Sequence, residues 1–179
     1  TAQWTATAAG CCILGTQSEG PYITHATRGQ IVDMGVTDMT NMGAAMAPAA
    51  FDTLRAVFRD TGTSPKDYDL IVTGDLGAVG SDILTELFRR EGMTLDNYTD
   101  CGLLLYDRKN QDMHAGGSGC GCSAAVLNGY LLEGMRQGRW RRLLFAPTGA
   151  LLSPTSSFQG ESIPGICHAV IFSRTKEDA

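Results

Sequence analysis

Apolar stripes at helical spacing alternate along this 179-residue chain with short runs of apolar and β-branched residues. A stripe of that kind predicts a helix that packs one face on a core, and a short apolar run between turns predicts a buried strand. Helices are predicted by three stripes, within residues 42–58, 83–88 and 126–135, which end at Gly62, Gly92 and Gly138. Strands are predicted at Leu70–Thr73, Gly102–Tyr106, Leu143–Pro147 and Ile166–Phe172. Helices that alternate with buried strands predict an α/β fold, in which helices cover a mixed sheet.

The start of the chain predicts two more strands with no helix between them. Gln3–Leu14 and Tyr22–Val32 both alternate β-favouring residues, and the turn signal Ser18–Pro21 between them predicts a hairpin. Further along, Ser81 is a suitable N-cap for the second helix. No linker or repeat divides the chain, so residues 1–179 are expected to form a single domain.

Composition narrows the classes of function. The chain has 14 Lys and Arg against 19 Asp and Glu, a formal net charge of −5, which lacks the bulk electrostatics of a duplex-binding protein. We therefore expect no nucleic acid partner. No apolar run approaches the roughly 20 residues that a membrane-spanning helix needs. No basic segment opens the chain as in a signal peptide, so we expect a soluble chain with no direct membrane span.

The six cysteines, at positions 11, 12, 101, 120, 122 and 167, lie among apolar and glycine residues. This setting favours reduced thiols over a disulfide framework. Cys120 and Cys122 are closer together than zinc ligands usually are, and no matching pair of histidines follows them. No metal site is therefore predicted from these residues.

The most informative stretch is His114–Cys122, which reads His-Ala-Gly-Gly-Ser-Gly-Cys-Gly-Cys and opens a predicted helix. Glycines allow a ligand to approach the backbone closely, and a helix start offers unpaired N–H groups with a partial positive charge. Such a turn accepts a carboxylate, a phosphate or an oxyanion, although no Walker-type Gly-Lys-Ser/Thr follows. Alternatively, the small residues let this helix pack tightly on its sheet, and the sequence leaves both interpretations open.

Two kinds of reactive side chain accompany this stretch. Cys120 and Cys122 are candidate nucleophiles, because a helix N-terminus lowers the pKa of a thiol, and His114 or His168 would complete a Cys–His pair. The alternative for both cysteines is a buried, small hydrophobic residue. Asp75 comes just after the predicted strand Leu70–Thr73, where α/β sheets collect ligands, or it caps the turn.

Five blocks of residues keep a common order and spacing: Met42–Ala50, Pro65–Leu76, Asp100–Leu103, Ala115–Ala124 and Thr148–Thr155. Together they resemble the stage V sporulation protein AD family, and Glu161–Pro164 and His168–Phe172 extend the match. That family has a thiolase-like fold made of two related α/β halves. The resemblance implies that this chain is the C-terminal half alone, a thiolase-like α/β unit with a mixed five-stranded sheet covered by helices, and that the N-terminal half is absent.

The resemblance also implies a function without catalysis: binding dipicolinic acid, with calcium, for transport into the developing spore. Condensing enzymes of the thiolase group have a catalytic histidine after the strand equivalent to Leu70–Thr73, where this chain has Gly74-Asp75-Leu76. The ketoacyl-synthase branch has a catalytic asparagine where Gly116-Gly117-Ser118 supplies glycine. Without these groups the usual polarised oxyanion site is missing, so no catalytic residue and no cofactor is expected. The alternative is a thiolase-type acyltransferase or condensing enzyme in which Cys120 or Cys122 replaces the second cysteine.

Partners and location follow from the same resemblance. The implied partners are dipicolinic acid, the other subunits of the sporulation stage V A complex, and a second copy in a homodimer, for which the Gln3–Leu14 strand would be the contact. The implied location is the forespore or spore, peripheral to the inner spore membrane.

A rigid planar dicarboxylate suits the donors of the glycine-rich stretch. Amide N–H groups around Gly116, Gly117 and Cys120, with the hydroxyls of Ser118 and Ser123, are expected to receive one carboxylate. His114 or an arginine would offset the remaining charge. Asp75 would repel a bare dianion, so it is expected either to hold a calcium ion or to order the turn.

Overall fold

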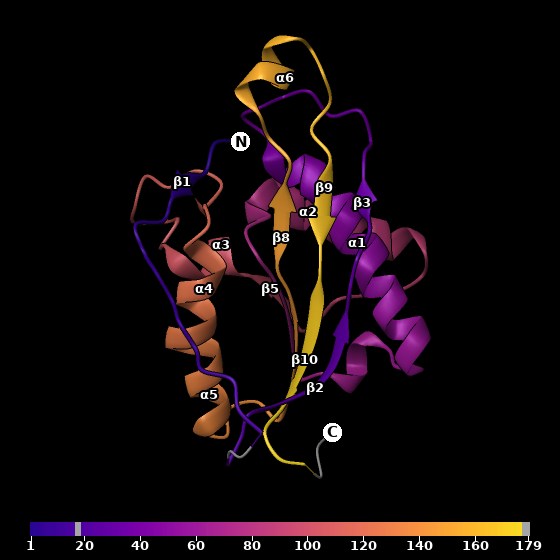
Figure 1. Ribbon diagram of the computed structural model, residues 1–179, viewed down its shortest axis with the longest axis vertical. Coiled ribbons are helices and arrows are strands. Elements are labelled where there is room, and N and C mark those ends of the chain that lie inside the picture. The colour runs from indigo at the N-terminus through magenta and orange to yellow at the C-terminus, as the bar shows by residue number, and fades with distance from the viewer. Residues whose placement is uncertain (17–18, 177–179) are drawn as a thin grey trace.

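The main sheet of the computed structural model has five strands (Figure 1). The structure describes residues 1–16 and 19–176, so Ser18 of the predicted turn at Ser18–Pro21 lies outside the described residues. β7 pairs in parallel with β4, and β4 with β5, whereas β10 is antiparallel to both β7 and β2. The α/β class and the mixed five-stranded sheet are therefore confirmed. Across the sheet, the strands are β2 (Tyr22–Thr27), β10 (Ala169–Ser173), β7 (Arg142–Ala146), β4 (Leu70–Thr73) and β5 (Tyr98–Asp100).

Helices cover both faces of this sheet because its central strands bury side chains on both faces. Ile71 and Leu144 face one side, where α1 (Met42–Thr61) and α2 (Gly77–Arg90) pack on them. Their neighbours Val72 and Leu143 face the other side. There three consecutive segments form a nearly continuous helix along the sheet: α4 (Cys122–Val126), the π-helical η2 (Leu127–Leu131) and α5 (Leu132–Arg136) (Figure 1).

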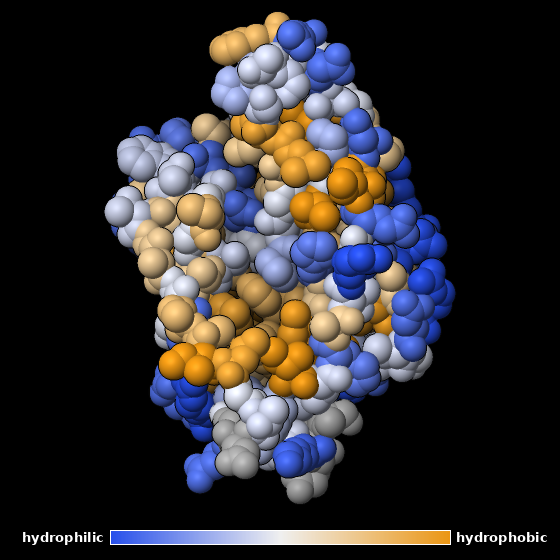
Figure 2. All heavy atoms as spheres, in the orientation of Figure 1, coloured by the Kyte–Doolittle hydropathy of each residue, from blue (hydrophilic) through white to orange (hydrophobic). Residues whose placement is uncertain are grey.

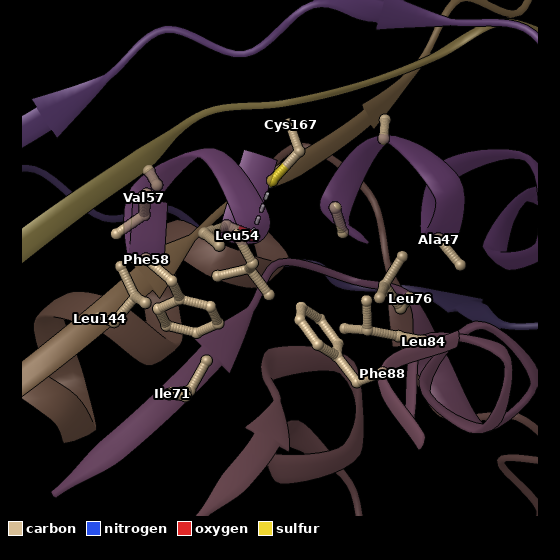
Figure 3. Packing of buried hydrophobic residues seen from close by; sticks show 14 of the residues in the cluster. Ala47, Leu54, Val57, Phe58, Ile71, Leu76, Leu84, Phe88, Leu144 and Cys167 are labelled. Carbon is tan, nitrogen blue, oxygen red and sulfur yellow. Dashed lines mark hydrogen bonds between the residues drawn. The ribbon is translucent and has the colours of Figure 1, made fainter. Parts of the chain in front are cut away.

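The larger core lies between the sheet and the α1/α2 pair. Figure 3 shows Leu54 and Phe58 of α1 directed toward Phe88 of α2, above Ile71 and Leu144 of the sheet. The Phe58 and Phe88 rings meet edge to face with their centroids 6.0 Å apart. Burying side chains of this size stabilises a fold by about 1.5–3 kcal/mol each, so this layer fixes how α1 and α2 sit on the sheet.

Two small sheets extend the fold beyond the carboxyl ends of β4 and β7. One has the order β3-β9-β8 and is antiparallel, and the other pairs β1 with β6 in parallel. The remaining elements are β1 (Trp4–Thr5), β3 (Ile31–Val32), η1 (Pro65–Asp67), α3 (Cys101–Leu105), β6 (Gly117–Ser118), β8 (Thr148–Ala150), α6 (Pro154–Phe158) and β9 (Gly165–Cys167).

The predicted hairpin at the start of the chain is wrong. Of Gln3–Leu14 only Trp4–Thr5 is a strand, and it pairs with β6, whereas β2 pairs with β10. The second predicted strand, Tyr22–Val32, divides into β2 and β3, which belong to different sheets. Alternation identified β-competent residues, but the partner of a strand depends on which distant edge its apolar face can cover.

Three other predictions need correction. Gly102–Tyr106 is helical, because the Asp100 side chain caps α3 by accepting the Gly102 N–H at 2.9 Å. The second helix begins at Gly77, before Ser81, because the same carboxylate accepts the N–H groups of Leu76 and Gly77. Ile166–Phe172 spans the end of β9 and most of β10, which lie in different sheets on either side of His168.

The crossing of α1 and α2 leaves no room for a side chain at Gly43. A Cβ atom there would lie 2.3 Å from the Leu76 carbonyl oxygen, and one at Gly80 would lie 2.8 Å from the Gly43 carbonyl oxygen. Because the obstructing atoms are backbone, a methyl group would push the two helices apart. Close helix packing at this point therefore depends on glycine.

We predict that Gly43→Ala lowers the free energy of unfolding by about 1–3 kcal/mol, measured by urea denaturation. Gly129→Ala in η2 is the matched control, because no atom lies within 4 Å of the position that its Cβ would take. The control should keep or slightly raise the stability, by up to about 1 kcal/mol. Equal losses in the two variants would contradict the packing argument.

Candidate functional site at the carboxyl ends of the central strands

Two carboxyl groups, one buried and one partly buried, lie where the central parallel strands end. Asp100 ends β5 opposite Thr73 of β4, and Asp75 follows β4 by two residues. The carboxyl ends of parallel strands in open α/β sheets are the usual place for ligands. The Asp75 side chain meets the glycine-rich stretch here, so the structure joins two features that the sequence identified separately.

Asp100 holds four donors with its two carboxylate oxygens. Oδ2 accepts the Thr73 hydroxyl at 2.6 Å and the Leu76 N–H at 2.9 Å. Oδ1 accepts the Gly77 N–H at 3.0 Å and the Gly102 N–H at 2.9 Å. A single side chain thus satisfies backbone donors at the starts of both α2 and α3, which would otherwise be unpaired.

The network continues from Thr73 to a tyrosine on the neighbouring strand. The Tyr98 hydroxyl lies 2.7 Å from the Thr73 hydroxyl oxygen and 3.0 Å from that of Ser81. Burial and the nearby Asp100 carboxylate both raise the pKa of Tyr98, so this phenol stays protonated at neutral pH. Tyr98 therefore acts here as a hydrogen-bonding group that ties β5 to α2.

Asp75 performs a similar task for the glycine-rich turn. Its Oδ2 accepts the Ser118 hydroxyl at 3.1 Å and the Gly119 N–H at 3.0 Å, and its Oδ1 accepts the Thr148 hydroxyl at 3.2 Å. Gln3 links the Asp75 backbone to the glycine-rich turn, because its Nε2 donates to the carbonyl oxygens of Asp75 at 2.9 Å and Gly117 at 2.8 Å. One donor predicted to receive a ligand carboxylate, the Ser118 hydroxyl, thus already donates to a carboxylate of the protein, together with the neighbouring Gly119 N–H.

Electrostatics at the site oppose ionisation of its acids and thiols. Burial raises the pKa of both Asp75 and Asp100, although hydrogen bonds to each carboxylate act in the opposite direction. Burial, reinforced by both carboxylates, also raises the pKa of Cys101 and raises that of Cys122 to about 12. A thiol in this setting is a poor nucleophile at neutral pH, so the structure favours the buried hydrophobic role for Cys122.

The structure brings together only some of the seven residues predicted for the site. Gly117, Ser118 and Asp75 meet, as described. The Gly116 backbone has a φ of +107° and packs closely on Gly102, because a Cβ atom at Gly116 would lie 2.6 Å from the Gly102 carbonyl oxygen. Cys120 is exposed beside them, and Ser123 is partly buried near the start of α4.

The predicted histidine partners lie at the margin or outside the site. His114 is exposed, with its Nε2 3.5 Å from Asp112 Oδ1, and its backbone oxygen accepts the Arg108 Nε–H at 2.9 Å. His168 is exposed beside β9 and accepts the Gly29 N–H at 3.2 Å. Within residues 1–16 and 19–176, no hydrogen bond joins an imidazole ring to a cysteine side chain; the Cys167 thiol donates to the backbone carbonyl oxygens of Ala146 and His168. No Cys–His pair forms in this part of the chain.

Sequence reasoning missed Asp100, Thr148 and Gln3. Asp100 had a usable local signal, since an aspartate directly before Cys101-Gly102 fits an N-cap, although the predicted strand at Gly102–Tyr106 obscured it. Gln3 and Thr148 reach Asp75 across more than 70 residues of sequence and gave no local signal.

Neither a metal centre nor a membrane span emerges from the described residues. Residues 1–16 and 19–176 contain no cluster of three or more His, Cys, Asp or Glu side chains that could hold a metal ion. In the same ranges, no helix has the length and apolar character needed to cross a bilayer.

The chain was compared first with solved structures. The α/β structure resembles the crystal structure of 3-oxoacyl-(acyl-carrier-protein) synthase III from Aquifex aeolicus VF5, with a TM-score of 0.45 and 14% sequence identity. The match covers 88% of this chain and 46% of that enzyme.

The sequence comparisons then give the family. The chain matches the family Stage V sporulation protein AD over residues 1–173, and it belongs to that family. It is 44% identical over 175 residues to the stage V sporulation protein AD of Bacillus subtilis (strain 168). The aligned residues make up 97% of this chain and 52% of that relative. The chain therefore spans about half the length of the curated relative that it matches.

The different donors of the two carboxylates generate a stability prediction. Asp100 holds three backbone N–H groups, which cannot reverse their direction, so the amide of Asp100→Asn would face at least one of them. We expect a loss of about 2–4 kcal/mol in the free energy of unfolding. Asp75→Asn is the matched control, because two of its three partners are hydroxyls that can reorient, and its loss should stay near 1 kcal/mol.

The stability of Asp75→Asn should also depend on pH differently from that of the wild type. Because the folded-state pKa of Asp75 is raised above 3.8, the folded state retains a proton that the unfolded state has lost. The contribution of Asp75 to stability is therefore largest at acid pH and falls as pH rises through its folded pKa. The stability difference between wild type and Asp75→Asn should follow this trend in urea titrations from pH 4 to 7, and a difference that grows with pH would contradict it.

Proposed function

We propose that this chain is half of a non-enzymatic component of the dipicolinic acid uptake machinery of sporulation, and that it helps to bind dipicolinic acid for transport into the developing spore. Membership of the stage V sporulation protein AD family supports the sporulation role. The observation that carries the non-enzymatic part is the use of Ser118 and Gly119 as donors to Asp75. Groups committed to an internal carboxylate are not available to stabilise a reacting oxyanion.

The reactive side chains of the chain support the same conclusion. Acyl transfer through cysteine needs a thiolate and a base to form it. Burial raises the pKa of Cys101, Cys122 and Cys167, and β4 is followed by Gly74-Asp75-Leu76, with no imidazole. Within the described ranges, the three histidines are exposed and none of their imidazole rings forms a hydrogen bond with a thiol.

Ligand contacts in this proposal lie at the rim of the carboxyl-end site. His114 and Cys120 are exposed there, and Arg108 reaches the rim through its hydrogen bond to the His114 carbonyl oxygen. A guanidinium and an imidazole suit a planar dicarboxylate, because both donate hydrogen bonds in the plane of their rings or forks. The buried Ser118 and Asp75 would set the shape of the turn that carries this rim.

Calcium does not fit as a resident ion at Asp75. The ion needs six to eight oxygen ligands, whereas Asp75 already accepts three hydrogen bonds and Asp100 accepts four. We therefore assign Asp75 to ordering the turn, which is one of the two roles expected for it. Calcium that travels with dipicolinic acid would enter as part of the cargo.

The proposal includes partners and a location. The partners are the other subunits of the sporulation stage V A complex and a second copy of the protein in a homodimer. The location is the forespore or spore, peripheral to the inner spore membrane. Because the chain spans about half of its curated relative, each of these refers to the family-length protein.

Calorimetry with dipicolinic acid tests the binding proposal in a family-length polypeptide that contains this chain. Ser118→Ala removes one of the three donors to Asp75, so the turn should loosen and the affinity should fall by about tenfold. His114→Gln should weaken binding by removing the imidazole ring and its N–H donors from the rim. Ser157→Ala in the distant α6 is the matched control and should bind as the wild type does. Unchanged affinity in Ser118→Ala, Asp75→Asn and His114→Gln together would reject this site.

The alternative function is that of a thiolase-type acyltransferase, and the observation that favours it is the exposed thiol of Cys120 beside the glycine-rich turn. We predict that incubation of the family-length polypeptide with acyl-coenzyme A leaves Cys120 unacylated, as read by mass spectrometry of its peptides. Cys11, which is also exposed, controls for nonspecific acylation. Acylation of Cys120 above that of Cys11 would favour the enzyme and contradict the non-enzymatic proposal.

A further inference from the structure

A polar cavity, called the amino-end cavity below, lies where the parallel strands β4 and β7 begin. It has a volume of about 290 Å³ and is lined by Lys66–Asp69, which lead into β4, and by Arg141 and Arg142 at the start of β7. Because Leu70 pairs with Leu143, the two segments enter the sheet side by side. The length of the strands therefore separates this cavity from the site at their carboxyl ends.

The backbone that carries the two arginines is held by Asp69. The Asp69 Oδ2 accepts the Arg141 N–H at 2.6 Å and the Arg142 N–H at 3.0 Å, and the Asp69 N–H donates to the Arg142 carbonyl oxygen at 2.9 Å. The other carboxylate of the cavity is also engaged, because Asp67 Oδ2 accepts the Ser64 N–H at 2.7 Å and the Ser64 hydroxyl at 2.8 Å. Both acids thus order the backbone of the cavity before any ligand binds.

The Arg142 guanidinium is held by an aromatic ring. Its central carbon lies 5.1 Å from the centroid of the Tyr68 ring, and Tyr68 is only 3% exposed. The Tyr68 hydroxyl lies 2.9 Å from the Thr63 hydroxyl oxygen, which fixes the ring in turn. Stacking on a fixed ring restricts a guanidinium to few orientations without neutralising its charge. The Arg142 Nε is buried, and no acceptor from the described part of the chain reaches it.

The cations of the amino-end cavity are not committed to partners within the protein. Among residues 1–16 and 19–176, the side chains of Lys66, Arg141 and Arg142 form no ion pair and donate no hydrogen bond. These three cations against two carboxylates leave the lining with a net charge of +1, in a chain whose formal net charge is −5. The cavity therefore offers donors and positive charge to an anion.

The surroundings of the cavity are basic as well. Residues 136–142, which lead from the end of α5 to the start of β7, include four arginines and no acidic residue. Figure 2 shows hydrophilic side chains at the lower end of the molecule, where α5 ends in Figure 1. A local concentration of positive charge raises the concentration of anions near the surface.

We propose that the amino-end cavity binds a phosphate group, with Lys66, Arg141 and Arg142 as the donors. An arginine fork matches two phosphate oxygens, and a lysine adds a third charge-assisted hydrogen bond. A phosphate offers three oxygens to three cations, whereas a carboxylate offers two. A soluble phosphorylated small molecule and the head group of an anionic phospholipid both present this group. The inference does not rest on dipicolinic acid binding, because the cavity contains none of the residues assigned to that function.

Calorimetry with glycerol phosphate tests the site in a family-length polypeptide that contains this chain. Lys66→Gln combined with Arg141→Gln should weaken binding at least about tenfold, because two of the three donors are lost. Both side chains are exposed, so the melting temperature should not change. Arg28→Gln is the matched control, because Arg28 is also exposed but follows β2, outside the cavity, and it should bind as the wild type does.

Arg142→Lys separates the guanidinium fork from its charge. This variant keeps a cation but loses the planar group that stacks on Tyr68, so the affinity for glycerol phosphate should fall about fivefold. Unchanged affinity would contradict the assignment of Arg142 as a donor.

Cosedimentation with vesicles distinguishes the two sources of phosphate. A lipid head group predicts that the polypeptide pellets with mixed phosphatidylglycerol and phosphatidylcholine vesicles but not with pure phosphatidylcholine, and that the Lys66 and Arg141 double variant stays in solution. A soluble ligand predicts binding of glycerol phosphate without pelleting. Either result supports a phosphate site. The proposal is overturned if neither probe binds, if the double variant binds both as the wild type does, or if only polyglutamate binds, because the occupant would then be an acidic peptide.

Discussion

The carboxylate of Asp100 is the interaction on which the carboxyl end of this fold depends. Its four donors come from β4, from the start of α2 and from the start of α3, so one side chain at the end of β5 orients the two helices that follow β4 and β5. A carboxylate can do this in a buried place because each oxygen accepts two hydrogen bonds, which offset much of the cost of removing the charge from water. Its raised pKa shows that burial still outweighs them.

Asp75 decides what the neighbouring glycine-rich turn can do. Glycine-rich turns before helices attract anions because their N–H groups point outward. Here Ser118 and Gly119 point at Asp75, and Thr148 completes the set from β8. Two donors of the turn are therefore already engaged by an anion of the protein itself. These contacts order the turn without any external ligand.

The chain is well packed on one face of its main sheet and less well covered on the other. The α1/α2 layer buries large side chains such as Phe88 and Leu54 completely. On the opposite face, α4, η2, α5 and the extended residues 7–16 leave apolar side chains such as Ile13 and Leu14 open to solvent.

The sequence by itself determined the α/β class, the strands β4 and β7 and most of α1, because apolar spacing reports which faces of an element are buried. The family followed from the resemblance of its motif blocks. It also placed Asp75 after a strand and Ser118 in a glycine-rich turn. Tertiary structure alone decided that these two residues meet, that Asp100 caps two helices, and that most of Gln3–Leu14 lies unpaired along α4. The physical reason is distance along the chain: spacing encodes the direction of a side chain, whereas hydrogen-bond partners dozens of residues away are fixed only when the packed layers bring them together.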